Sequence, residues 1–207
     1  MTALPSITLY RLPTKDDLPP AAVPWLPDAR RALLLIHDMQ QYFLAPFPEQ
    51  MRTELVDRTA QLRERCARLG IPVAYTAQPG RMSDVDRGLL RDFWGPGMRA
   101  DQEDRAVAAE LAPAQGDLVL TKWRYSAFFR SPLLERMQEW GRDQILLCGV
   151  YAHVGIAATA LDAFTHDIQP FLVADAVGDF TEEHHRQALS YTAENTGRVL
   201  LAEQVFA

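Results

Sequence analysis

The sequence predicts an α/β protein with a three-layer α/β/α sandwich around a six-stranded parallel sheet, and two patterns support that fold class. Short apolar runs of strand length alternate along the chain with longer segments whose apolar residues recur at helical spacing. In such an alternation each helix forms a right-handed crossover between two parallel strands. The run at 32–36 is apolar at every position, which is typical of a strand covered by helices on both faces. We expect residues 1–207 to form one domain, since the chain is long enough for a single large core.

The first 30 residues differ from the rest of the chain in their high proline content. Proline lacks an amide N–H and fixes φ, so this stretch can form neither a long helix nor a central strand. We predict an extended N-terminal arm over 1–30 that lies on the domain or on a partner subunit. Its prolines are Pro5, Pro13, Pro19, Pro20, Pro24 and Pro27.

From residue 32 onward the expected strands and helices follow one another in order. The first strand leads to a helix at 51–69 that ends at Gly70. Ser131 and Pro132 open a later helix, and Thr181 caps the last one. The expected strands are 32–36, 71–77, 117–123, 144–150, 168–174 and 198–201, and the expected helices are 51–69, 131–140, 152–166 and 181–197.

The segment 78–100 is expected to form an irregular loop, because glycine and proline recur along it. A loop of this length in a compact domain is usually functional. Its punctuating residues are Pro79, Gly80, Gly95, Pro96 and Gly97.

Composition narrows the class of protein. A hydrophobic share of 48% and a charged share of 23% are ordinary for a globular protein, and a net charge of −6 argues against a nucleic-acid surface. No apolar stretch is long enough to span a bilayer and no leader pattern opens the chain, so we expect a cytoplasmic protein. Cys66 and Cys148 have no metal-ligand spacing, and neither a disulfide nor a zinc site is expected.

The five histidines also lack the spacing of a metal site such as HExxH. His184 and His185 fall early in the last helix and are expected at the surface, whereas His153 is expected to be a hydrogen-bonded structural residue. The segment after the first strand lacks the glycines of a phosphate-binding loop, so a nucleotide-binding module is only a weak alternative.

Polar side chains gather where the predicted strands end, and in a parallel sheet those ends share one edge, at which ligands bind. Asp38 alone could be a turn or cap residue, and Lys122 alone could be a solvated surface lysine. The aromatic residues around Lys122 instead suggest a pocket in which an Asp and a Lys would shift each other's pKa. The residues at the strand ends are Asp38, Gln78, Lys122, Arg124, Tyr125, Tyr151, Asp175 and Asp179.

Four motifs in order resemble the isochorismatase family: LLIHDMQ at 34–40, DFWGPG at 92–97, KWRYSAF at 122–128 and GVYAHVG at 149–155. The resemblance covers nearly the whole chain and implies the fold predicted above. It also implies hydrolysis of an enolpyruvyl ether of a small dicarboxylate, with release of pyruvate and no metal or organic cofactor. A homodimer is implied as well, and no nucleic-acid or membrane partner is expected.

The wider superfamily includes cysteine hydrolases that use an Asp, a Lys and a Cys nucleophile, and the Cys position corresponds to Gly155 here. Without a thiol at this position no acyl-enzyme can form there, so amidase activity is disfavoured. Two explanations of Gly155 stay open: close approach of a ligand beside the 150–151 backbone, and tight packing of the helix against the sheet. The resemblance implies that the 150–151 linkage is a cis peptide.

The resemblance, together with vinyl ether chemistry, assigns Asp38 as the general acid that protonates the substrate. Lys122 would hold Asp38 ionised until a substrate carboxylate draws the ammonium away. The remaining candidates bind or enclose the substrate. Gln78, Arg87 and the backbone amide of Tyr151 are expected to bind carboxylates and ring substituents, and Trp94, Tyr125, Phe43 and Pro46 are expected to form apolar walls.

Two substrates fit this family: isochorismate and 2-amino-2-deoxyisochorismate. The segments 45–49 and 75–80 look most like the stand-alone phenazine-pathway branch of the family, whose product is trans-2,3-dihydro-3-hydroxyanthranilate, and the chain ends soon after its last predicted strand. We therefore favour the amino substrate. An isochorismatase of siderophore biosynthesis is the closer alternative, and a non-catalytic interaction domain is the more distant one.

Overall fold

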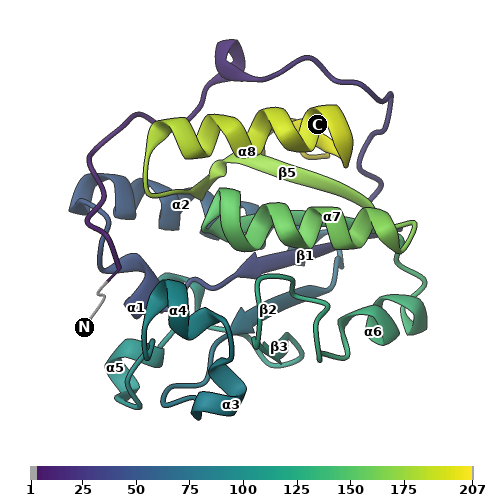
Figure 1. Cartoon of the computed structure of the whole chain (residues 1–207). Helices are drawn as coiled ribbons and strands as arrows, with labels where there is room; N and C mark the ends of the chain where they lie inside the picture. Colours follow the sequence, from purple (N-terminus) through teal and green to yellow (C-terminus); the bar gives the residue numbers. More distant parts are fainter. Residues whose placement is uncertain (1–3, 207) are drawn as a thin grey trace.

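A six-stranded sheet forms the middle layer of the computed structural model, which describes residues 4–206 (Figure 1). Every pair of neighbouring strands is parallel, as the alternation of strands and helices predicted. The order across the sheet is β3-β2-β1-β4-β5-β6. The strands are β1 (Ala32–His37), β2 (Val73–Ala77), β3 (Leu118–Thr121), β4 (Gln144–Val150), β5 (Gln169–Gly178) and β6 (Arg198–Leu200).

Helices cover both faces of the sheet (Figure 1). β1 contributes to both hydrophobic cores because its side chains alternate. Leu34 and Ile36 belong to the core that includes α2, whereas Leu33 and Leu35 belong to the core that includes the other three long helices. The three-layer sandwich is therefore confirmed. The four helices are α2 (Glu49–Arg68), α6 (Leu133–Glu139), α7 (Ala157–Thr165) and α8 (Glu182–Asn195).

The strand order reverses at β1, which pairs with β2 on one side and with β4 on the other. His37, the last residue of β1, lies in register with Thr76 of β2 and with Gly149 of β4. The crevice outside the carboxyl ends of strands at such a reversal is where open α/β sheets bind ligands. Asp38 follows immediately and lies at this point.

Two sequence predictions need correction at the ends of elements. The predicted helix at 152–166 begins instead with a π-helical turn, η3 (Ala152–Ile156), in which the Ile156 amide donates to the carbonyl of Tyr151. The predicted strand at 168–174 continues to Gly178, because after a shift in register Val177 and Gly178 pair with Gly149 and Val150 of β4. Asp175 therefore lies inside β5 rather than at its end.

The segment 78–100 is less irregular than predicted, since it contains α3 (Asp84–Arg87) and α4 (Leu90–Trp94). The Ser83 side chain caps α3 by accepting from the amide of Asp86. Helices this short carry no periodic apolar pattern, so the sequence did not reveal them. Other short elements are α1 (Gln41–Leu44), α5 (Gln102–Arg105), η1 (Lys15–Asp17), η2 (Ala109–Leu111) and η4 (Ala202–Gln204).

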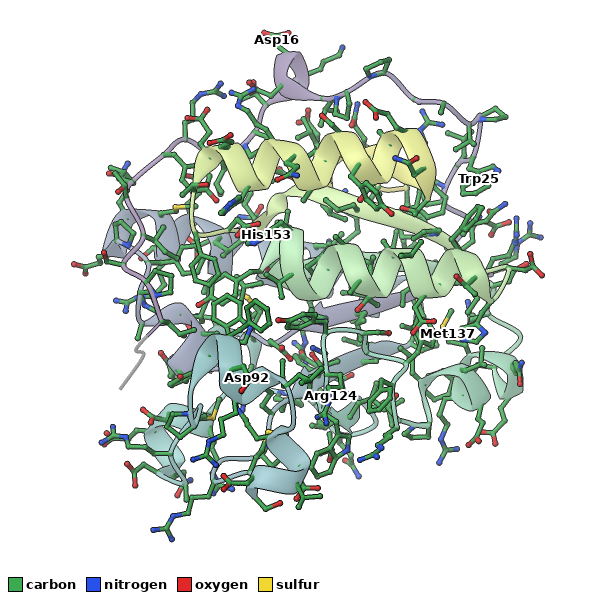
Figure 2. The ribbon with its side chains drawn as sticks, in the orientation of Figure 1. Asp16, Trp25, Asp92, Arg124, Met137 and His153 are labelled. Atoms are coloured by element: carbon green, nitrogen blue, oxygen red, sulfur yellow. The ribbon has the colours of Figure 1, made fainter. Side chains whose placement is uncertain are left out.

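The N-terminal arm runs across the molecule and, apart from η1, has no regular secondary structure in its described part (Figure 1). Its first residues, 1–3, lie outside the described residues. Figure 2 places Trp25 of the arm near the C-terminal end of α8, where its carbonyl accepts from Arg198. The hydroxyl of Tyr10 bonds to the backbone of Asp179 and to Nδ1 of His185. The described arm thus lies on its own domain. In residues 4–206 no helix has the length and apolar character needed to cross a membrane.

Candidate active site

One pocket at the carboxyl edge of the sheet brings together most of the predicted site residues. It holds about 510 Å³ of empty space, including its open mouth. Pro46 is not part of its lining, and its carbonyl instead accepts from the Ile7 amide of the arm. The predicted residues that do line it are Asp38, Lys122, Gly155, Gln78, Arg87, Trp94, Tyr125, Tyr151 and Phe43, together with Leu4, His37, Tyr42, Leu90, Val150, Val154 and Phe180.

Asp38 and Lys122 form a buried ion pair in this pocket. The Lys122 Nζ atom lies 3.3 Å from Oδ2 of Asp38, and the two side chains are only 3% and 7% exposed, respectively. The Thr76 hydroxyl donates to the other carboxylate oxygen and accepts from the Asp38 amide. Asp38 has φ of +51°, a left-handed conformation that aspartate tolerates better than most residues. The turn after β1 therefore directs the carboxylate toward β2 and β3.

The surroundings of Asp38 act on its pKa in opposite directions. Burial alone would raise it, but Lys122 and the hydrogen bond from Thr76 oppose burial, and the pKa of Asp38 lies below its ordinary value. Burial lowers the pKa of Lys122, and the carboxylate of Asp38 partly offsets that effect. The carboxyl is therefore ionised in the ligand-free pocket at neutral pH.

Arg87 is buried, so it is not one of the solvated arginines of its segment. Its guanidinium donates to the carbonyl of Gly95 at 2.9 Å, to Oε1 of Gln78 at 3.3 Å and to the carbonyl of Trp94 at 3.5 Å. Gly97 packs against this group and has φ of +77°, and a Cβ there would lie within 2.8 Å of it. The glycine-rich loop thus wraps the guanidinium and fixes its direction.

Gln40 holds the backbone of Gln78 in place through two hydrogen bonds, a role that the sequence did not reveal. Its Oε1 accepts from the amide of Gln78 at 2.7 Å, and its Nε2 donates to the carbonyls of Gln78 and Arg105. Gln40 is almost fully buried, and without these hydrogen bonds the burial of its side-chain amide would cost free energy. Gln40 could have been recognised as a site residue from its place in the LLIHDMQ motif, two residues after Asp38.

An aromatic wall closes the other side of the pocket. The rings of Tyr151 and Phe180 stack with centroids 4.0 Å apart, and Phe180 stacks on Trp94 at 5.7 Å. The indole N–H of Trp94 donates to the hydroxyl of Tyr125 at 2.8 Å. Phe180 directly follows the polar residue Asp179 after β5, but a lone phenylalanine gave no sign of this role. Phe43 accepts from the Tyr151 hydroxyl through its carbonyl.

The peptide bond between Val150 and Tyr151 is cis, as the resemblance implied. Gly155 lies in η3, and the nearest atoms to a Cβ built on it belong to the imidazole of His37. Packing against a side chain therefore accounts for this glycine in the ligand-free pocket. Of the two explanations left open for Gly155, tight packing agrees better with the structure than close approach of a ligand does.

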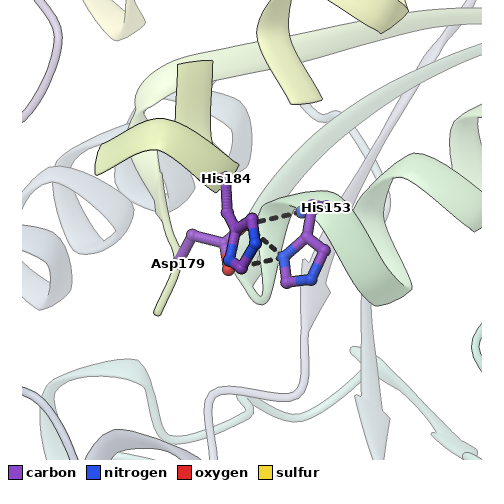
Figure 3. A group of neighbouring side chains, drawn as sticks. All are labelled: His153, Asp179 and His184. Carbon is purple, nitrogen blue, oxygen red and sulfur yellow. Dashed lines mark hydrogen bonds and ion pairs between the residues drawn. The ribbon is translucent and has the colours of Figure 1, made fainter. Parts of the chain in front are cut away.

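His153, Asp179 and His184 lie side by side (Figure 3), and the His153 ring packs with its edge against Phe180 of the aromatic wall. The buried carboxylate of Asp179 accepts from the backbone amides of His153 and Phe180 and from Nδ1 of His153. The imidazoles of His153 and His184 stack at 4.1 Å. His153 is thus hydrogen-bonded as predicted, and the cluster ties the turn after β4 to the turn after β5. The three come from separate segments, so sequence spacing could not reveal the cluster.

The prediction that His185 lies at the surface was wrong, because only 1% of this residue is exposed. Its Nδ1 bonds to the Tyr10 hydroxyl and its Nε2 to the carbonyl of Ala174. Burial lowers the pKa of His185 to about 4, so it is neutral. The cover comes from the N-terminal arm, which is 175 residues away in sequence.

A family model and similar proteins of known sequence agree on one family for this chain. A family model described as the isochorismatase domain matches residues 32–204. The chain is 56% identical to the phenazine biosynthesis protein PhzD1 of Pseudomonas aeruginosa over 205 residues, 99% of each protein. It is 47% identical to enterobactin synthase component B of Escherichia coli over 205 residues, which are 98% of this chain and 72% of that protein. A solved cysteine hydrolase from Pseudomonas syringae pv. phaseolicola has a TM-score of 0.81 at 21% identity, covering 90% of this chain and 95% of that one, and shares the fold.

Proposed function

The chain belongs to the isochorismatase family, and from that premise we propose that it hydrolyses the enolpyruvyl ether of 2-amino-2-deoxyisochorismate or isochorismate, releasing pyruvate. The observation that carries the proposal is the buried carboxyl of Asp38, which faces a pocket with a glycine at residue 155. Such a pocket offers a carboxyl group that can donate a proton once it is protonated, and it has no nucleophilic side chain at residue 155. Vinyl ether hydrolysis requires a proton donor of this kind.

The proposed reaction begins when the Asp38 carboxyl transfers a proton to the terminal methylene carbon of the enolpyruvyl group. The C=C electron pair forms the new C–H bond, and the ether carbon becomes an oxocarbenium ion. Water then adds to this carbon and loses a proton, which the Asp38 carboxylate can take back. The resulting hemiketal collapses to pyruvate and the ring alcohol, so atoms and charge balance without a covalent enzyme intermediate.

Asp38 must gain its proton when substrate binds, because its pKa lies below the ordinary value in the ligand-free pocket. We propose that Lys122 turns its ammonium toward a substrate carboxylate and so weakens its hold on Asp38. The substrate's own negative charge and the exclusion of water by the aromatic wall would raise the pKa of Asp38 further.

Arg87 and Gln78 are proposed to bind the substrate carboxylates and ring substituents, with the backbone amide of Tyr151. The guanidinium is already held in place by two backbone carbonyls and by Oε1 of Gln78, so little side-chain entropy would be lost on binding. Trp94, Tyr125 and Phe43 are proposed to hold the ring and the enolpyruvyl group against Asp38, since all three line the same pocket.

We favour the amino substrate over isochorismate. The support is the match to a phenazine biosynthesis protein over 99% of both chains, against 72% coverage of enterobactin synthase component B at lower identity. An isochorismatase of siderophore biosynthesis is the second candidate, supported by the latter match.

We further propose that the enzyme works as a homodimer in the cytoplasm. Leu161, Phe164 and Tyr191 leave large apolar side chains exposed on α7 and α8, which is typical of an interface. Cys66 and Cys148 are buried free thiols, which suits a reducing compartment. Light scattering after size-exclusion chromatography would measure the oligomer, and a monomer at micromolar concentration would contradict the dimer.

Pyruvate release tests the proposed reaction. Each substrate is incubated with the protein, pyruvate is followed with a coupled lactate dehydrogenase, and kcat/KM is compared between the two. We expect release from both and a higher kcat/KM for the amino substrate. Absence of pyruvate from both would refute the function, whereas a higher value for isochorismate would favour the siderophore reaction. A rate that rises into the alkaline range with no acidic group required would exclude Asp38 as the acid.

A further inference from the structure

Residue 155 has no room for a side chain because the imidazole of His37 fills that space. A Cβ built on Gly155 would overlap the His37 ring at Cε1 and would lie 2.9 Å from Nε2 and 3.2 Å from Nδ1. All three atoms belong to one rigid ring, so the overlap cannot be relieved by bending a flexible chain end. Gly155 and His37 both line the proposed active-site pocket.

The His37 ring is held where it is by the sheet and by a hydrogen bond. His37 ends β1, and its backbone lies in register with both neighbouring strands. Gly149 on β4 allows this close approach, since a Cβ there would collide with the carbonyl of His37. The ring nitrogen Nδ1 lies 2.8 Å from the carbonyl of Val150. The residue is fully buried, so the ring cannot swing out to solvent.

The hydrogen bond also sets the proton position on the ring. A carbonyl can only accept, so Nδ1 carries the proton in the neutral imidazole and Nε2 carries a lone pair. Nε2 is buried and has no hydrogen-bond partner within the described residues. An apolar side chain of similar size would fill the same space without an unpaired nitrogen. The imidazole next to Asp38 is therefore neutral, and its protonated Nδ1 lies 3.7 Å from Oδ2 of Asp38.

We propose that His37 is a specificity-determining residue, which restricts this pocket to proton-transfer chemistry by occupying the volume that a side chain at residue 155 would need. The inference deepens the proposed function, on which its catalytic meaning rests. It treats His37 and Gly155 as one coupled pair: the glycine is required because the imidazole is present. Residue 155 could then carry a nucleophilic side chain only after His37 had been replaced by a smaller residue.

A double-mutant cycle tests the coupling without reference to activity. Gly155→Ala, His37→Ala and the double variant are compared by thermal unfolding. We expect Gly155→Ala alone to lower Tm by about 5–10 °C or to prevent folding. In the His37→Ala background the same change should cost nothing or raise Tm, because the new methyl enters the vacated space. An equal loss in both backgrounds, or failure of the double variant to fold where His37→Ala alone folds, would overturn the proposal.

His185 provides a matched control, since it is also a buried histidine but bonds to Tyr10 and Ala174 rather than lying against residue 155. His185→Ala is expected to destabilise the protein without rescuing Gly155→Ala. If His185→Ala also restored the stability that Gly155→Ala loses, the rescue would not be specific to His37. The proposed pairing of His37 with Gly155 would then be wrong.

A thiol readout tests the chemical consequence. Cys66 and Cys148 are buried and burial raises the pKa of both thiols, so the folded protein should react negligibly with iodoacetamide. Gly155→Cys combined with His37→Ala should fold and be alkylated at one site, at least tenfold faster than the parent. Gly155→Cys alone should unfold or aggregate. A stable single variant alkylated as fast as the double one would overturn the proposal, whereas lack of pyruvate release by the parent would refute only the proposed function.

Discussion

Lys122 and Asp38 face each other across 3.3 Å in a pocket that hides both side chains from solvent. A buried ion pair of this kind is expensive to desolvate and is weak evidence for stability, so its position at the strand ends favours a chemical role. Because of this ion pair, the protonation state of Asp38 depends on which other groups the Lys122 ammonium can contact. A substrate carboxylate is the natural competitor for its ammonium.

Replacing the proposed acid tests its role directly. Asp38→Asn keeps the size of the side chain and an oxygen that can accept from Thr76, but it cannot transfer a proton. We expect kcat for pyruvate release to fall by about 10²- to 10⁴-fold. Circular dichroism should show an intact fold. Asp16→Asn changes an exposed carboxyl on η1, which Figure 2 shows at the edge of the molecule beyond α8; it serves as the control and should leave kcat unchanged. Retention of kcat in Asp38→Asn would remove this residue from the reaction.

Arg87→Ala tests carboxylate binding. Loss of a fixed, charged donor should raise KM by about 10- to 100-fold with a smaller effect on kcat, because the guanidinium contacts the substrate before and during the reaction. Steady-state kinetics with the coupled assay measure both constants. The exposed Arg91 is the matched control, and Arg91→Ala should leave KM as it is. An unchanged KM in a folded Arg87→Ala variant would exclude the assignment.

Asp179→Ala tests the hydrogen bonds by which Asp179 joins the turn after β4 to the turn after β5. The change leaves two backbone amides and the His153 imidazole without their common acceptor, at a cost of about 3 kcal/mol or a Tm loss of about 6–12 °C. Because Phe180 follows Asp179 and stacks on Tyr151, KM should rise as well. Calorimetry and kinetics measure the two effects. Asp92→Ala, at an exposed carboxyl, should change neither, and a wild-type Tm in Asp179→Ala would contradict the prediction.

Acid should weaken the fold through its buried neutral histidines. Burial lowers the pKa of His37 and of His185 to about 4, against 6.5 for an ordinary histidine. Between these values the unfolded chain binds more protons than the folded protein, so the free energy of unfolding falls as pH decreases. Each histidine contributes up to about 1.4 kcal/mol per pH unit in this window.

Thermal unfolding at several pH values between 4 and 7 measures this slope. His185→Gln should reduce the proton uptake on unfolding by about one near pH 5, because its buried neutral imidazole can no longer gain a proton when the chain unfolds. A slope that His185→Gln does not change would show that this histidine is not the source.

The sequence was sufficient to predict the sheet, since apolar runs and helical spacing are local patterns. β4 begins and ends at the predicted residues, and Asp38, Gln78 and Lys122 follow their strands as expected. Other features depend on contacts between distant segments. His185 is buried by the arm, and Phe180 joins the pocket only because β5 lies beside β4. Neither contact leaves a periodic trace in the sequence.

The position of the His37 side chain could not be predicted from the sequence, although that of its neighbour Asp38 could. His37 stood in the same motif as Asp38, yet nothing in the motif indicated that its ring lies against Gly155. That relation requires the register between β1 and β4 and the path of the turn after β4. The sequence was compatible with two explanations of Gly155, and its contact with His37 in the structure favours packing.

The N-terminal arm has a practical consequence. Leu4 lines the pocket and Tyr10 is bonded to the backbone of Asp179, so the beginning of the described chain forms part of the wall of the proposed active site. An affinity tag or a fluorescent protein fused ahead of the arm would therefore lie close in sequence to a residue that lines the pocket, and we expect it to alter the measured kinetics. Purification handles are better placed at the other end of the polypeptide, or removed by a protease before assay.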